Sequence, residues 1–132
     1  MVLVDANVLL DVLTDDPQWA DWSASQLERS VRRGLAINPV IYGEVAVGFR
    51  REEDLESALA LADLKRLELP YGAAFRAGHA FVAYRKRGGL RRSPLPDFLI
   101  GAHAEVEGMT LLTRDATRYR TYFPKLKLIA PD

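Results

Sequence analysis

Four acidic residues stand at positions in this sequence where a carboxylate is costly. Asp5 follows the apolar run Val-Leu-Val, and Asp115 follows the segment Thr-Leu-Leu-Thr-Arg. Glu44 is the only charged residue within NPVIYGEVAVGF, and Asp97 is the only acid within SPLPDFLIGAHA. A carboxylate in apolar surroundings destabilises a fold unless it is paired, hydrogen-bonded or bound to a metal. The four acids are therefore candidates for one functional site.

Each acid taken alone also has a structural explanation. Asp97 follows Pro96 at an expected helix start, where it would interact favourably with the helix dipole. Asp115 could cap a short helix that follows it. Glu44 could pair with a neighbouring arginine. Only the position of all four in the fold distinguishes these explanations from a shared site.

The expected fold is α/β, because short apolar segments alternate with longer helical patterns. Strands are predicted at 2–4, 35–37, 109–112 and 127–129, with 67–69 as a short strand or only a connection. Helices are predicted at 6–13, 17–34, 39–49, 52–66, 71–87, 97–107 and 116–122. Such alternation indicates a short, mostly parallel central sheet with helices on both faces. Residues 1–132 contain no internal repeat and are predicted to form one domain.

A parallel sheet would bring these acids together, because ligands bind at the carboxyl ends of its strands. Asp5 and Asp115 both come just after predicted strands, and Glu44 and Asp97 lie in or near helices that could cover the same edge. Four converging carboxylates would repel one another and raise one another's pKa values. A hard cation such as Mg²⁺ or Mn²⁺ removes that conflict, whereas zinc would favour imidazole or thiolate ligands. Such a site suits phosphodiester hydrolysis.

Composition excludes several other classes of protein. The 132 residues are 48% hydrophobic and 27% charged, with no cysteine, which excludes disulfides and thiolate chemistry and fits a reducing cytoplasm. No apolar run is long enough to span a membrane, and the N-terminus lacks the basic segment of a signal peptide. A net charge of zero argues against a non-specific nucleic-acid coat.

The motifs DANVLLD, PVIYGEV, PDFLIGAHA and LLTRD, followed by YRTYFP, resemble the PIN-domain ribonucleases. In particular, the chain is similar to the VapC toxins of prokaryotic type II toxin–antitoxin systems, over nearly its whole length. The resemblance implies a three-layer α/β/α fold and a metal-dependent endoribonuclease. It also implies a homodimer, and an antitoxin that inserts a segment near the active site.

The resemblance also assigns site residues. Asp5, Glu44, Asp97 and Asp115 match the acidic quartet of the family. Asn7 and Thr113 match polar positions that often line the metal pocket. Ala6 stands where many members carry a hydroxyl residue, which puts a secondary hydrogen bond in doubt.

A cluster of basic residues precedes Asp97 and is a candidate contact for the RNA backbone. Its members are Arg85, Lys86, Arg87, Arg91 and Arg92. A solvated helix end explains them equally well, since basic residues are favourable at a helix C-terminus. Arg114 could contact a phosphate or pair with an acid. Asp11 is expected to face solvent near the pocket, and Tyr119 to pack in the core or in a dimer interface.

Two alternatives from other functional classes stay open at this point. A phosphatase could use Asp5 as a nucleophile at a strand end, but that pattern needs a second aspartate where this chain has Asn7. A non-catalytic PIN-like module that binds RNA or protein could keep the acids for structural reasons. The module predicts RNA binding that is insensitive to EDTA, without cleavage.

Overall fold

The computed structural model describes residues 1–60, 62–89 and 94–131, and its centre is a five-stranded sheet. The strands are β1 (Val2–Val4), β2 (Leu35–Ile37), β3 (Leu64–Arg66), β4 (Thr110–Leu112) and β5 (Lys127–Ile129). They are arranged in the order β3-β2-β1-β4-β5, and every neighbouring pair is parallel. The three inner strands are entirely buried, whereas the edge strands β3 and β5 carry lysine or arginine side chains and are partly exposed. Apolar inner strands and charged edges are the pattern that keeps a covered parallel sheet from pairing further.

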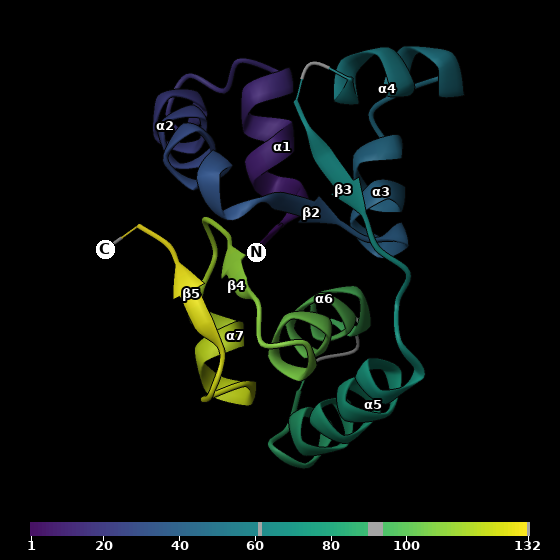
Figure 1. Cartoon of the computed structure of the whole chain (residues 1–132). Helices are drawn as coiled ribbons and strands as arrows, with labels where there is room; N and C mark the ends of the chain where they lie inside the picture. The colour runs from purple at the N-terminus through teal and green to yellow at the C-terminus, as the bar shows by residue number, and fades with distance from the viewer. Residues whose placement is uncertain (61, 90–93, 132) are drawn as a thin grey trace.

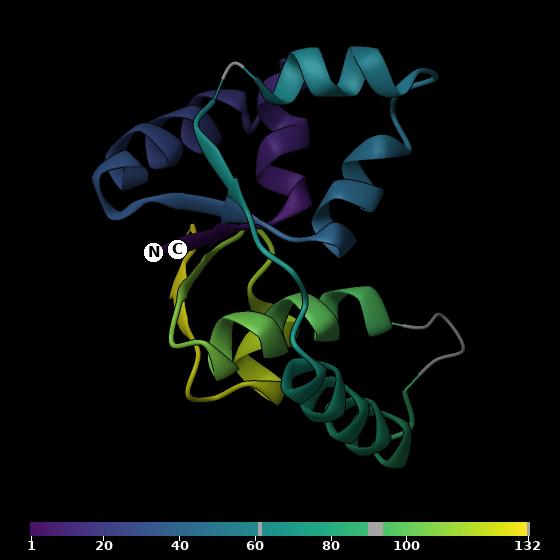
Figure 2. The same cartoon turned by 45° about the vertical axis from the view of Figure 1, so that its right-hand side comes forward.

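Helices cover both faces of the sheet. On one side lie α1 (Ala6–Leu13), α2 (Ala20–Ser30), α3 (Pro39–Ala46) and α4 (Glu52–Leu59), with a 3₁₀ turn, η1 (Val31–Arg33), after α2. On the other side lie α5 (Tyr71–Lys86), α6 (Leu95–Val106) and α7 (Thr117–Tyr122), as Figures 1 and 2 show. The predicted three-layer α/β/α arrangement is thereby confirmed. None of the helices in the described ranges is long and apolar enough to cross a membrane.

Polar residues at strand ends start the helices that follow. The carboxylate of Asp5 accepts a hydrogen bond from the backbone N–H of Ala6 at 2.8 Å and caps α1. Asn38 caps α3 in the same way, accepting from the N–H of Ile41 at 2.9 Å. These caps satisfy helix donors that would otherwise be buried without partners, so each helix begins directly at the edge of the sheet.

One element differs from its predicted position. The helix expected over 52–66 ends at Leu59, and the third strand is Leu64–Arg66 rather than 67–69. The alanine- and leucine-rich sequence after Leu59 continues a helical pattern, which misled the prediction. The strand nevertheless forms there because Leu64 to Arg66 pair with all of β2 at the sheet edge, where charged side chains can remain in solvent.

A glycine in α6 fixes the position of α7. A β-carbon at Gly101 would lie 2.9 Å from ring atoms of both Tyr119 and Phe123. The missing side chain therefore lets α7 pack closely on α6. This close contact directs the buried ring of Tyr119 toward the carboxyl ends of the central strands.

Candidate active site

The sheet brings the Asp5 and Asp115 segments side by side. The backbone N–H of Asp5 donates to the carbonyl of Leu112 at 2.9 Å, so the chain leaves β1 next to the end of β4. The hydroxyl of Thr113 then donates to Oδ2 of Asp5 at 2.9 Å and accepts from the backbone N–H of Asp115 at 3.2 Å. Asn7 donates to the same Thr113 hydroxyl at 3.2 Å. Asn7 and Thr113 thus lie between two of the four acids.

Asp5 is buried, and its surroundings disfavour the ionised form of its carboxylate. Burial raises its pKa from 3.8 to about 6, against the lowering effect of hydrogen bonds from Thr113 and Tyr119, and the charge of Asp97 raises it further. Glu44, on α3, is half-buried, and its pKa rises from 4.5 to about 7. The cause is again burial first, and then the charges of Asp5 and Asp97. Repulsion therefore connects Asp5, Glu44 and Asp97 across three different elements.

Asp97 and Asp115 complete the group on the other side of the sheet edge. Asp97 lies in the first turn of α6, and burial raises its pKa against the lowering effect of the charge and hydrogen bond of Arg118. The charge of Asp115 raises the pKa of Asp97 further. Asp115 is exposed in the loop before α7. Since α3 packs against α6, Glu44 and Asp97 cover the edge from opposite layers. The four acids are thus electrostatic neighbours although they are widely separated in sequence.

Two residues that the sequence analysis did not assign to the site take part in it. The hydroxyl of Tyr119 donates to Oδ2 of Asp5 at 3.0 Å, so this residue is more than the packing residue that was expected. Arg118 donates from Nη1 to Oδ2 of Asp97 at 2.6 Å. The available signal was spacing, because both residues lie within four positions of Asp115 at the start of a short helix. Their partners could not be read from that spacing.

The donor set fits a hard divalent cation. All four groups are carboxylates, and within the described ranges neither Asp5 nor Glu44 has an ion-pair partner to relieve its repulsion. No three carboxylate or histidine side chains in those ranges lie close enough together to hold one ion directly. Since Asp97 is paired with Arg118, binding would require either bridging waters or the separation of that pair. Magnesium sites in proteins retain several waters, so this spacing is compatible with the chemistry.

Three of the five basic residues that are candidates for RNA contact lie within the described part of the chain. Arg85 and Lys86 form the last turn of α5, and Arg87 follows it with its guanidinium 5.6 Å from the ring centre of Tyr122. Arg91 and Arg92 lie outside the described residues. An open depression beside the acids is lined by Arg87, Asp115, Thr117, Arg118, Thr121 and Tyr122.

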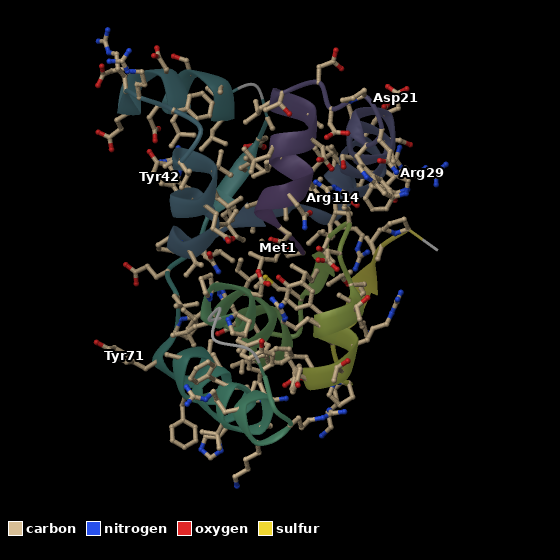
Figure 3. The ribbon with its side chains drawn as sticks, turned by 180° about the vertical axis from the view of Figure 1, so that it is seen from behind. Met1, Asp21, Arg29, Tyr42, Tyr71 and Arg114 are labelled. Atoms are coloured by element: carbon tan, nitrogen blue, oxygen red, sulfur yellow. The ribbon has the colours of Figure 1, made fainter. Side chains whose placement is uncertain are left out.

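Arg114 is held by Asp11 rather than extended into solvent. Its Nε and Nη2 donate to the two carboxylate oxygens of Asp11 at 2.8 and 2.9 Å, beside α1 (Figure 3). Asp11 also accepts from the hydroxyl of Ser23 at 2.8 Å and is only 2% exposed. The expectation that Asp11 faces solvent is therefore wrong, because two donors on other segments satisfy its buried carboxylate.

Comparison with known families matches residues 2–124 to the PIN domain. The chain belongs to the PIN domain family. Comparison with curated proteins finds no match to this PIN domain. Among solved structures, it is similar to VapBC2 of Rickettsia felis bound to a promoter DNA fragment, with a TM-score of 0.77, 22% identity and 100% of both chains covered.

Two further structures have the same fold as this PIN domain. A toxin–antitoxin complex from Klebsiella pneumoniae has a TM-score of 0.67 and 24% identity, with 100% of this chain and 98% of that chain covered. VapBC-1 of nontypeable Haemophilus influenzae has a TM-score of 0.73 and 17% identity, with 98% of each chain covered. The family and fold expected from the sequence motifs are both confirmed.

Proposed function

We propose that this chain is a single-domain, Mg²⁺- or Mn²⁺-dependent endoribonuclease that hydrolyses RNA phosphodiester bonds and acts as the toxin of a toxin–antitoxin pair. The main support is the burial of Asp5, Glu44 and Asp97 at the carboxyl edge of a parallel sheet, which raises the pKa of all three. The charges of neighbouring acids raise these pKa values further. Keeping such acids together destabilises a protein unless a cation binds them. The PIN domain match favours nuclease chemistry over the alternative of a phosphatase.

The proposed roles follow from the surroundings of each acid. Asp5, Asp97 and Asp115 would hold the ion, directly or through water, and Glu44 would complete the pocket as a ligand or by orienting water. The ion would lower the pKa of a bound water and neutralise charge on the phosphate. Thr113 and Tyr119 orient the carboxylate of Asp5 through its Oδ2 atom. Glu44, with a pKa of about 7, can take up or release a proton near neutral pH.

The partners in this proposal are an RNA substrate, an antitoxin and a second copy of the chain. Structures with this fold are described as toxin–antitoxin complexes, which supports an antitoxin partner and a cytoplasmic setting.

Tyr71, Phe75 and Val82 on α5 are 95%, 70% and 51% exposed, and Tyr71 points away from the molecule in Figure 3. An apolar face of this kind suits burial in a homodimer. Light scattering should show a dimer that Phe75→Glu converts to a monomer.

The substitution Asp5→Asn tests the nuclease proposal, because it keeps the size of the side chain and removes its charge. Purified protein is incubated with cellular RNAs, with Mg²⁺, Mn²⁺ or EDTA, and the cleaved ends are mapped. We expect wild-type cleavage only with metal, and a loss of about 100-fold or more in Asp5→Asn. The control is Asp21→Asn, an exposed acid on α2.

Two results would contradict the proposal. If a folded Asp5→Asn variant cleaves RNA at the wild-type rate, Asp5 takes no part in the mechanism. RNA binding that EDTA does not affect, without cleavage under any metal condition, would instead identify a non-catalytic binding module. Thermal unfolding of each variant establishes that it is folded before its activity is compared.

A further inference from the structure

Arg118 lies between the acidic site and the depression beside it. Its Nη1 is 2.6 Å from Oδ2 of Asp97, and its guanidinium lies 5.9 Å from the ring centre of Tyr84. The side chain is 42% exposed, so its ion pair with Asp97 faces solvent. An exposed ion pair contributes little to stability and can separate at low cost.

Arg87 contacts Tyr122, a ring that packs against Tyr84. Its guanidinium is 5.6 Å from the ring centre of Tyr122, and the rings of Tyr122 and Tyr84 are 5.9 Å apart, edge to face. Each arginine therefore rests on one ring of a packed tyrosine pair. Contacts of this type hold a guanidinium in place even when it has no anionic partner.

The depression between the two arginines has the chemistry of a phosphate site. Arg87 and Arg118 supply positive charge, and Thr117 adds a hydroxyl group to the lining. The hydroxyl of Thr121, which also lines the depression, donates to the carbonyl of Thr117 at 3.0 Å. Asp115 lines it as well, so the depression reaches one of the four acids. This charge beside the acids suits a phosphate group of the nucleic-acid backbone.

We propose that Arg118 exchanges partners during the function proposed above, on which this inference rests. In the metal-free protein Arg118 neutralises Asp97. When Asp97 binds a divalent cation, Arg118 leaves this carboxylate, stays on the Tyr84 ring and contacts a backbone phosphate together with Arg87. The ion pair thus offsets the negative charge of Asp97 before the cation binds. Its separation makes the guanidinium of Arg118 available to a phosphate.

Calorimetric titration with Mn²⁺ in the absence of RNA tests the first half of the exchange. Arg118→Ala removes the cation that competes for Asp97, so we expect Mn²⁺ to bind about two- to fivefold more tightly than to the wild type. Arg118→Lys should stay close to the wild type. The matched control is Arg120→Ala, an exposed arginine two positions along α7. Unchanged or weaker Mn²⁺ binding by folded Arg118→Ala would overturn the proposal.

RNA binding tests the second half. The affinity for a fluorescent single-stranded RNA is measured at several salt concentrations, with Ca²⁺ or with EDTA, and the RNA is checked for cleavage afterwards. With Ca²⁺, Arg118→Ala and Arg87→Ala should each reduce the slope of log affinity against log salt by about 0.7, the value for one phosphate contact. With EDTA, Arg87→Ala should keep its effect and Arg118→Ala should have none. An equal effect of Arg118→Ala in both conditions would overturn the exchange.

The two proposals can fail separately. If the wild type binds neither Mn²⁺ nor Ca²⁺ at the acids, the metal-dependent function itself is wrong. If the wild type binds these ions and cleaves RNA while Arg118→Ala matches it in every measurement, only the exchange is wrong.

Discussion

Tyr119 and Thr113 donate hydrogen bonds to the same oxygen of Asp5, at 3.0 and 2.9 Å. In this chain the residue after Asp5 is an alanine, which has no hydroxyl to offer. The two hydroxyls come instead from β4's end and from α7. Both hydrogen bonds lower the pKa of Asp5 and so favour the ionised form that a cation needs.

Tyr119→Phe should weaken cation binding at low pH. The ring is kept, so the core should lose only about 1 kcal/mol with the hydrogen bond. The pKa of Asp5 should rise above its value of about 6, because a stabiliser of the carboxylate is removed. Mn²⁺ titrations at about pH 6 and about pH 8 should show a larger loss of affinity at the lower pH. Tyr71→Phe, at an exposed tyrosine, is the control, and an equal loss at both pH values would contradict this role.

The metal-free protein should lose stability as pH rises through the weakly acidic range. Asp5 and Glu44 have folded-state pKa values of about 6 and about 7, above their ordinary 3.8 and 4.5. Between about pH 4 and pH 7 the folded protein therefore binds more protons than the unfolded chain, and the free energy of unfolding falls with rising pH. In EDTA, urea unfolding at about pH 5 and about pH 8 should show a drop in the wild type. That drop should be smaller in Asp5→Asn/Glu44→Gln by on the order of 1 to 3 kcal/mol. An equal drop in the wild type and in the double variant would show that Asp5 and Glu44 do not have raised pKa values.

Adding a divalent cation near pH 8 should reverse that loss. A ligand that binds only the folded state at about 100 times its dissociation constant adds about 2.7 kcal/mol to the free energy of unfolding. Thermal unfolding with Mn²⁺ and with EDTA should therefore differ by several degrees in the wild type. The shift should nearly disappear in Asp5→Asn and persist in Asp21→Asn. A shift of equal size in all three proteins would place the bound ion elsewhere.

Arg114→Ala should destabilise the fold. Among the residues that the structure describes, only the hydroxyl of Ser23 would then remain as a side-chain partner of the Asp11 carboxylate, which is 2% exposed. Removing one member of a buried pair costs several kcal/mol, and since Arg114 is itself partly exposed we expect about 2 to 4 kcal/mol. Urea unfolding measures the change, with Arg29→Ala as the exposed control (Figure 3).

Arg114→Ala, together with a double variant, also tests whether Arg114 contacts RNA, one of the two roles that the sequence allows. Asp11→Asn/Arg114→Gln should recover part of the lost stability, because no buried charge is left unpaired. If Arg114 also contacts RNA, both variants should lower the salt slope of RNA affinity by about 0.7. Unchanged RNA affinity in the double variant would limit Arg114 to a structural role.

The sequence was sufficient to predict most elements, because their signals are local. The β-branched and apolar runs at 2–4 and 35–37 are buried strands, and Asp5 and Asn38 cap the helices that follow them. Such patterns depend on a few neighbouring residues. The third strand was misplaced because an edge strand with Lys65 and Arg66 has neither an apolar pattern nor a length that separates it from a helix end.

The sequence by itself determined which acids stand at strand ends and in apolar helices, and hence that a parallel sheet would gather them at one edge. Only the tertiary structure decided their partners. Tyr119 reaches Asp5 across 114 residues, and Arg114 reaches Asp11 across 103. The pairing of Arg118 with Asp97 depends equally on how α7 packs on α6. That packing is set by contacts such as the missing side chain at Gly101, and local periodicity contains no information on contacts between distant segments.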